Sequence, residues 1–165
     1  MRVYLARHGR ALEKEVDPER SLSPEGLAEV ERVARFLANA RLDIPQCWHS
    51  GKARARQTAE ILVKHIAPGA PVEAHEGLAP NDPVKPVAAE LRRRNEDLLI
   101  AGHLPFLAKL ASLLVAGDSE ADLLTLPSGA VLCLERIDAG AWTMAWFVTP
   151  ELAPGKTDMG ASAGS

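Results

Sequence analysis

The feature that most constrains the fold is the alternation of short apolar runs with longer segments of helical periodicity. Five runs are typical of β-strands, over residues 2–6, 46–50, 97–102, 131–137 and 142–148. Each of the first three precedes a helix-like segment, whereas the last two follow one another around the turn Asp138-Ala139-Gly140. Parallel neighbours need a crossover, and consecutive strands form a hairpin. We therefore expect one three-layer α/β/α domain with a mostly parallel sheet and at least one antiparallel edge.

The helices carry boundary signals of their own. Ser23 is a typical N-cap and Pro24 suits the first helical position. Apolar residues then recur on one face at Leu27, Val30, Ala34 and Leu37. Further helices are expected over 51–66, from Val84 to Leu91, and from Pro105 through residue 115.

Two segments lack such periodicity. Residues 71–83 are irregular and contain proline, with at most a short strand near Val72. From Glu151 onward, Pro, Gly, Ser and Ala dominate, which favours a flexible C-terminal tail. We therefore expect the folded domain over residues 1–150 and the tail over 151–165.

Composition excludes several classes of protein. The 165 residues carry a net charge of −3, so no basic surplus indicates binding to nucleic acid. The N-terminal apolar run is too short for a signal peptide, and no later run approaches a membrane span. Cys47 and Cys133 have no metal-ligand spacing, so two reduced core thiols are expected. We expect a cytoplasmic protein without a membrane partner; the sequence does not define its oligomeric state.

Polar clusters follow three of the predicted strands. They are Arg7-His8-Gly9, the segment Ser50 to Arg54, and Gly102-His103. In open α/β sheets the carboxyl ends of parallel strands meet at one edge, where ligands bind. The sequence therefore predicts that two histidines and two arginines gather at this edge.

That set of side chains suits phosphoryl chemistry. A neutral imidazole is a competent nucleophile toward phosphorus, and arginine offers bidentate hydrogen bonds to phosphate. Gly9 allows the backbone to approach closely beside His8. The segment Ser50 to Arg54 opens a helix, whose free N–H groups favour an anion.

Each signal has a simpler interpretation when taken alone. The tripeptide Arg-His-Gly is weak by itself, Arg54 would be a solvated helix charge, and His103 a polar residue before a helix. His49, His65 and His75 are interpreted as surface or satisfied core residues, and Arg92-Arg93-Arg94 as a solvated helix end. Only the placement of the first set after three strands favours a site.

Four stretches, in order, resemble the histidine phosphatase superfamily, which includes the phosphoglycerate mutases, and especially its small SixA-type phosphohistidine phosphatase branch. They are Ala6-Arg7-His8-Gly9, Arg20-Ser21-Leu22-Ser23-Pro24-Glu25-Gly26, Ser50-Gly51-Lys52-Ala53-Arg54-Ala55-Arg56-Gln57-Thr58, and Gly102-His103-Leu104-Pro105. Arg10, Ser21 and Gly51 depart from the family's pattern, but none of them removes a catalytic group.

The resemblance implies a phosphoglycerate mutase-like fold and a role for each matched residue. His8 would be the nucleophile that becomes phosphohistidine. Arg7, Arg54 and His103 would bind and stabilise the transferring phosphoryl. Gly9, Arg20 and Ser50 would contact the substrate. No metal or cofactor is expected.

The general acid is the open point, because Glu76 and Asp82 are candidates that lie outside every matched stretch. An imidazole leaving group departs readily once protonated, whereas an alkoxide needs an acid. The sequence therefore favours hydrolysis of phosphohistidine on a partner protein. Alternatives are a phosphatase for a small phosphomonoester, which would use one of these carboxylates, and a module that binds phosphate without turnover. A mutase is disfavoured, since the chain lacks the extra segments and the clear carboxylate that the resemblance implies for such enzymes.

Overall fold

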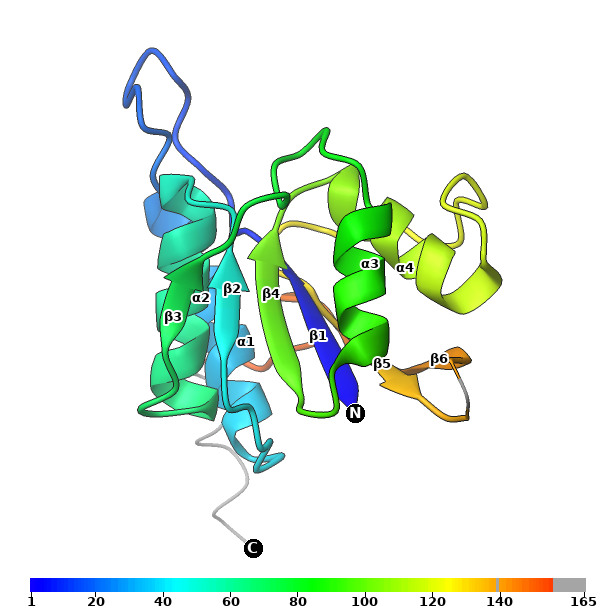
Figure 1. Cartoon of the computed structure of the whole chain (residues 1–165). Helices are drawn as coiled ribbons and strands as arrows, with labels where there is room; N and C mark the ends of the chain where they lie inside the picture. Colours follow the sequence, from blue (N-terminus) through cyan, green and yellow to red (C-terminus); the bar gives the residue numbers. More distant parts are fainter. Residues whose placement is uncertain (139, 156–165) are drawn as a thin grey trace, which may run out of the picture.

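A six-stranded sheet forms the centre of the molecule, in the strand order β3-β2-β4-β1-β5-β6 (Figure 1). The computed structural model describes residues 1–138 and 140–155. The strands are β1 (Arg2–Arg7), β2 (Cys47–His49), β3 (Val72–Ala74), β4 (Leu98–Gly102), β5 (Val131–Arg136) and β6 (Trp142–Val148). The first four in the sheet order pair in parallel, while β5 and β6 add an antiparallel edge. The predicted mixed sheet is confirmed.

Helices cover both faces of this sheet. They are α1 (Pro24–Ala38), α2 (Ala53–Ile66), α3 (Lys85–Arg93) and α4 (Phe106–Ala116). Along β1 the side chains alternate between two cores, since Val3 and Leu5 pack with α3 and α4, whereas Tyr4 and Ala6 pack with α1 and α2. This alternation builds the expected three-layer α/β/α domain.

The start of α1 follows the predicted capping. Ser23 is the N-cap, its Oγ accepts a hydrogen bond from the Gly26 N–H at 3.0 Å, and Pro24 occupies the first turn. The predicted apolar face needs one correction, because Leu27 is 42% exposed. Gly26 and Val33 lie on the buried face instead.

Several other boundaries differ by one or two residues from the sequence prediction. The strand expected over 46–50 is shorter, since β2 spans only Cys47–His49. The helix expected from residue 51 begins at Ala53, because Gly51 turns the chain with a φ of 87°. Pro105 is the N-cap of α4 rather than its first residue. A left-handed Gly117, with φ of 74°, ends that helix.

The chain after β6 is folded for longer than the sequence indicates. The N–H groups of Leu152 and Ala153 both donate to the carbonyl of Thr149. Ala153 is only 4% exposed and packs in the core beside α1. Residues 156–165, the rest of the predicted tail, lie outside the described residues.

Of the helices in the described part of the chain, none has the length and apolar character needed to cross a membrane.

Candidate active site

Two histidines follow adjacent parallel strands at the same edge of the sheet. In the pairing of β1 with β4, Arg7 lies opposite Gly102. The next residues, His8 and His103, therefore leave the sheet together, and their ring centroids lie 5.0 Å apart. The His8 N–H also donates to the Gly102 carbonyl at 3.0 Å. We call this edge, where β1, β2 and β4 end, the active-site rim; it lies at the top in Figure 1.

The imidazole of His8 is held in one tautomer. Its Nδ1 lies 2.7 Å from the carbonyl oxygen of Gly9, which only accepts hydrogen bonds, so Nδ1 carries the proton. Nε2 therefore keeps its lone pair. Burial lowers the pKa of His8 to about 4, assisted by the positive charges of Arg54, Arg7 and Arg20, although the Gly9 bond opposes this shift. At neutral pH the ring is uncharged, as a nucleophile must be.

His103 is almost fully buried, at 1% exposure. Its Nε2 lies 2.6 Å from Ser50 Oγ, at the end of β2. Burial lowers its pKa to about 3, with smaller contributions from the charges of His8, Arg54, Lys52 and Arg7. Its Nδ1 is buried without a hydrogen-bond partner among the described residues. The active-site rim therefore holds two neutral imidazoles beside several cations.

The arginines retain unused donors. Arg7 donates from Nη1 to the Leu126 carbonyl at 2.7 Å, which fixes its guanidinium. Within the described chain, the Nε atoms of Arg7 and Arg54 are buried without a partner, but those of Arg32 and Arg94 are too. Burial lowers the pKa of both Arg7 and Arg54, and the charge of Arg20 adds to the effect on Arg54. Unpartnered cations gathered at one place favour an anion between them.

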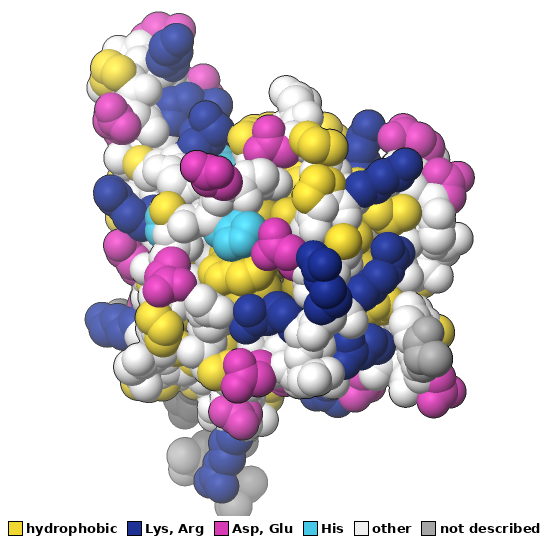
Figure 2. All heavy atoms as spheres, viewed as in Figure 1, with side chains coloured by type: hydrophobic (Ala, Val, Ile, Leu, Met, Phe, Trp, Pro, Cys, Tyr) yellow, Lys and Arg dark blue, Asp and Glu magenta, His cyan; other side chains and the backbone are white. Residues whose placement is uncertain are grey.

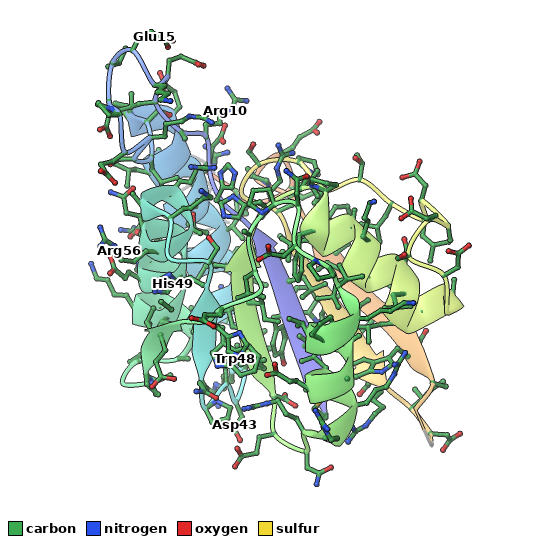
Figure 3. The ribbon with its side chains drawn as sticks, turned by 45° about the horizontal axis from the view of Figure 1, so that its top comes forward. Arg10, Glu15, Asp43, Trp48, His49 and Arg56 are labelled. Carbon is green, nitrogen blue, oxygen red and sulfur yellow. The ribbon has the colours of Figure 1, made fainter. Side chains whose placement is uncertain are left out.

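Arg20 lies at the base of a loop that rises beside the rim. This loop, residues 10–22, is the blue segment projecting at the upper left of Figure 1, and Figure 3 labels Arg10 and Glu15 on it. Arg20 adopts a left-handed φ of 51°, and its Nε donates to the Leu12 carbonyl at 3.3 Å. Its charge lowers the pKa of His8, so Arg20 belongs electrostatically to the site.

The loop itself is ordered by hydrogen bonds. The two carboxylate oxygens of Asp17 accept from the N–H groups of Glu19 and Ser21. Its surface mixes acidic and basic side chains, as the upper left of Figure 2 shows. Val16, in the middle of the loop, is 72% exposed.

Glu76 and Asp82 lie in the segment between β3 and α3. Glu76 is exposed, and Asp82 Oδ2 accepts from the Ala79 N–H at 2.8 Å, which closes a turn of that segment. Among the described residues, neither carboxylate forms a hydrogen bond with His8 or His103. A general acid acts on the leaving group rather than on these histidines, so both carboxylates stay candidates for that role.

The remaining histidines are satisfied elsewhere, as the sequence indicates. His49 Nδ1 accepts from the Gly51 N–H, and His65 Nε2 lies 2.7 Å from Glu31. His75 stacks on Trp48 with ring centroids 3.9 Å apart. One arginine differs from the expected solvated helix end, because Arg94 lies over the Trp48 ring and donates to Gln46.

Sequence reasoning assigned no role to Thr58, although it lies in one of the matched stretches. Its buried Oγ accepts from the Gly9 N–H at 3.1 Å and donates to the Arg54 carbonyl at 2.7 Å. The neighbouring Gln57 accepts from the Leu22 N–H at 2.7 Å through Oε1. Both residues thus tie α2 to the segments that follow β1.

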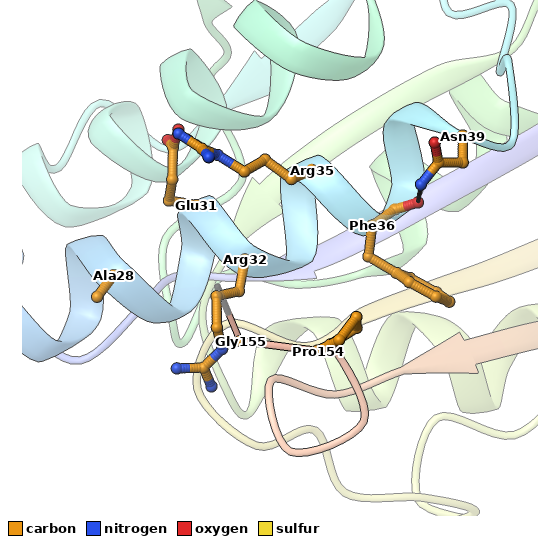
Figure 4. Close-up of a pocket in the computed structure, with 8 residues that line it drawn as sticks. All are labelled: Ala28, Glu31, Arg32, Arg35, Phe36, Asn39, Pro154 and Gly155. Atoms are coloured by element: carbon orange, nitrogen blue, oxygen red, sulfur yellow. Dashed lines mark hydrogen bonds and ion pairs between the residues drawn. The ribbon is translucent and has the colours of Figure 1, made fainter. Parts of the chain in front are cut away.

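A separate hollow lies beside α1, away from the rim. It measures about 530 Å³ and is lined by side chains that include Arg32, Phe36 and Pro154 (Figure 4). It has no histidine in its lining, so it is separate from the rim. Across the described residues, no three His, Cys, Asp or Glu side chains gather to hold a metal ion.

A neutral imidazole with a free lone pair, a second buried imidazole and two arginines whose buried Nε donors lack a partner among the described residues are side chains suited to phosphoryl transfer. The sequence model of the histidine phosphatase superfamily (branch 1) matches residues 3–82. This chain belongs to that superfamily and is a phosphatase.

Comparison with individual proteins shows which branch of the superfamily the chain resembles. The phosphohistidine phosphatase SixA of Escherichia coli is 26% identical over 155 residues, covering 91% of this chain and 94% of SixA. An uncharacterised protein of Picosynechococcus is 31% identical over 144 residues, covering 79% of this chain and 87% of that protein. Among solved structures, SixA complexed with tungstate gives a TM-score of 0.80 at 26% identity, covering 91% of this chain and 97% of that one. The chain therefore resembles the SixA-type branch over nearly its whole length.

Proposed function

We propose that this phosphatase removes the phosphoryl group from phosphohistidine on a partner protein in the cytoplasm, through a phosphohistidine intermediate on His8. The observation that carries the proposal is the gathering of a neutral His8, with its Nε2 lone pair free, beside buried arginine donors at one rim. The similarity to SixA, a phosphohistidine phosphatase by name, supports this substrate class.

Arg7 and Arg54 would hold the equatorial oxygens of the phosphoryl group, with Arg20 as a further contact. Their charges are already close to His8, since all three lower its pKa. The arriving anion reverses the local balance, because a nearby negative charge favours the charged form of a base. We therefore expect His103 to gain a proton when phosphate binds and to donate a hydrogen bond to it.

The reaction proceeds in two displacements. The second ring nitrogen of the substrate's phosphohistidine carries a proton, taken from solvent. Nε2 of His8 attacks phosphorus, the P–N bond of the substrate breaks, and its electron pair goes to the leaving nitrogen, so the imidazole departs neutral with the dephosphorylated protein. Water then attacks the phosphorus on His8 and loses a proton to solvent, the bond from phosphorus to Nε2 breaks, and the pair returns to Nε2. The net change is hydrolysis of one P–N bond to free histidine and inorganic phosphate.

The leaving group decides whether the reaction needs a positioned carboxylate. A protonated imidazole leaves without further assistance, whereas an alkoxide requires an acid in hydrogen-bonding reach. Glu76 is exposed, and Asp82 is engaged in its own turn. This arrangement favours a P–N bond as the one that breaks.

The decisive experiment compares phosphate release from a phosphohistidine protein and from p-nitrophenyl phosphate with one enzyme preparation. We expect the higher kcat/KM for the protein. Rapid quenching in alkali should leave an acid-labile, base-stable phosphate on His8, and His8→Ala should abolish it. A tenfold preference for a small ester would instead establish the metabolite phosphatase. Phosphate binding without turnover of either substrate would show that the protein is a module that binds phosphate only.

A further inference from the structure

Three consecutive hydrogen bonds connect α2 to the ring of His8. The Thr58 hydroxyl donates to the Arg54 carbonyl at 2.7 Å and accepts from the Gly9 N–H at 3.1 Å. The Gly9 carbonyl then accepts from His8 Nδ1 at 2.7 Å. The residue after His8 thus receives its orientation from a side chain of the helix that carries Arg54.

The contact is suited to holding this backbone in place. Thr58 is 1% exposed, and its hydroxyl accepts the hydrogen bond of the Gly9 N–H. If this hydroxyl were removed, the buried N–H would lose its partner and would not gain a water molecule instead. The backbone of Gly9 lies close to α1, because a Cβ placed there would be 2.7 Å from Val30 Cγ2 and 3.1 Å from the Gly26 carbonyl. The Thr58 hydroxyl supplies both the donor for Arg54 and the acceptor for Gly9, which an apolar side chain of the same shape does not.

We propose that Thr58 is a positioning residue for His8, which fixes the tautomer and the direction of the imidazole through the backbone of Gly9. Since its hydroxyl also holds the first turn of α2, Thr58 sets the placement of the nucleophile relative to Arg54. The proposal rests on the proposed function only in taking His8 as the nucleophile.

A purely structural role would give a different set of results. If Thr58 only stabilised the packing of α2, its loss would lower the melting temperature and leave the folded site unchanged. If it positions His8, the tautomer of the ring and the rate of phosphoryl transfer change in the folded protein. The binding of phosphate, which depends on the arginines, should change far less.

The test uses the full chain with Thr58→Val, which keeps the shape and removes the hydroxyl, and Thr58→Ser, which restores it. The matched control is Ser112→Ala in α4, another buried hydroxyl that accepts a loop N–H, from Leu123 at 3.4 Å. The ¹⁵N signals of His8 report which ring nitrogen carries the proton. Single-turnover quench reports the rate of His8 phosphorylation, and vanadate inhibition reports oxyanion affinity.

We expect Thr58→Val to mix the two neutral tautomers of His8 and to slow its phosphorylation by about tenfold or more, as loss of an orienting partner does. Vanadate affinity should change by less than about threefold, and Thr58→Ser should recover most of the rate. If Thr58→Val does not fold, Thr58→Cys, a weaker acceptor, should give an intermediate loss. An unchanged His8 tautomer and rate, or equal losses in Ser112→Ala, would overturn the proposal.

These readouts also separate the two proposals. The ¹⁵N measurement needs no turnover, so it tests Thr58 even in a protein that never forms phosphohistidine. A wild type without phosphohistidine would refute the proposed function alone.

Discussion

Ser50 Oγ lies 2.6 Å from Nε2 of His103, where the adjacent parallel strands β2 and β4 end. The hydroxyl is able to donate to a neutral ring nitrogen and to accept from a protonated one. Ser50 can therefore form this hydrogen bond with both charge states of His103, the neutral one and the cationic one expected with phosphate bound. Its predicted role as a direct substrate contact stays a prediction, while the structure adds this contact with the second histidine.

Replacing Ser50 by alanine tests this relationship. Ser50→Ala removes the one described hydrogen bond of the His103 ring, so we expect weaker vanadate inhibition and a loss of turnover of about tenfold. Ser50→Thr keeps the hydroxyl and should retain most of the activity. Steady-state kinetics with vanadate titration measures both. Equal losses in the two variants would show that bulk, not the hydroxyl, matters at this position.

Arg54 should contribute to catalysis without contributing to stability. Its pKa is lowered by burial and by Arg20, so its surroundings disfavour its charge. Arg54→Ala should lower turnover by about a hundredfold or more, as loss of a preorganised donor does. The melting temperature should stay unchanged or rise. Arg56→Ala is the matched control, because Arg56 is an exposed residue of the same helix and pairs only with Glu60 at 3.8 Å among the described residues.

Kinetics and thermal denaturation of both variants provide the measurement. An Arg54→Ala protein that melts well below the wild type, with full activity in its folded fraction, would contradict this assignment.

The fold and the convergence of the site were accessible from the sequence because both depend on chain order. Strand–helix alternation requires a parallel sheet, and residues after parallel strands must meet at one edge. The Thr58 contact was not accessible, since it depends on how α2 packs against Gly9. Leu27 shows the same limit, because helical spacing gives a face but not its angular width. Ala153 is buried by α1 and the sheet, which no local composition reveals.

The two histidines should make the folded protein sensitive to acid. Their folded pKa values, about 4 for His8 and about 3 for His103, lie below the unfolded value of 6.5. Between these limits the unfolded chain binds more protons than the folded one, so stability is complete above pH 6.5 and falls as the pH drops. Each histidine should raise the unfolding constant by at most about tenfold per pH unit in that window.

Urea denaturation at pH 7.5 and pH 5 measures this sensitivity. His103→Gln should lose less stability than the wild type between the two values. The ¹⁵N titration of His8 should show a midpoint near 4 that moves upward in Arg54→Ala, because a repelling cation is removed. Midpoints near 6.5 for both rings, with equal pH dependence in His103→Gln, would contradict the expectation.

Substituting the two carboxylates between β3 and α3 tests whether the bond that the enzyme breaks is P–N or P–O. Glu76→Gln and Asp82→Asn keep the size of each side chain, and the amide introduced by Asp82→Asn retains an oxygen to accept from the Ala79 N–H, so the segment should keep its turn. The double variant removes both candidate acids. An imidazole leaves after protonation from solvent, whereas an alkoxide departs slowly without a positioned acid. We therefore expect the double variant to hydrolyse the phosphohistidine protein at nearly the wild-type rate and small esters at least about tenfold more slowly.

Parallel kcat/KM measurements on the two substrates, with each single variant as control, test this expectation. If phosphohistidine hydrolysis falls as steeply as ester hydrolysis, an acid acts on both leaving groups and the argument for a P–N substrate from the missing carboxylate fails.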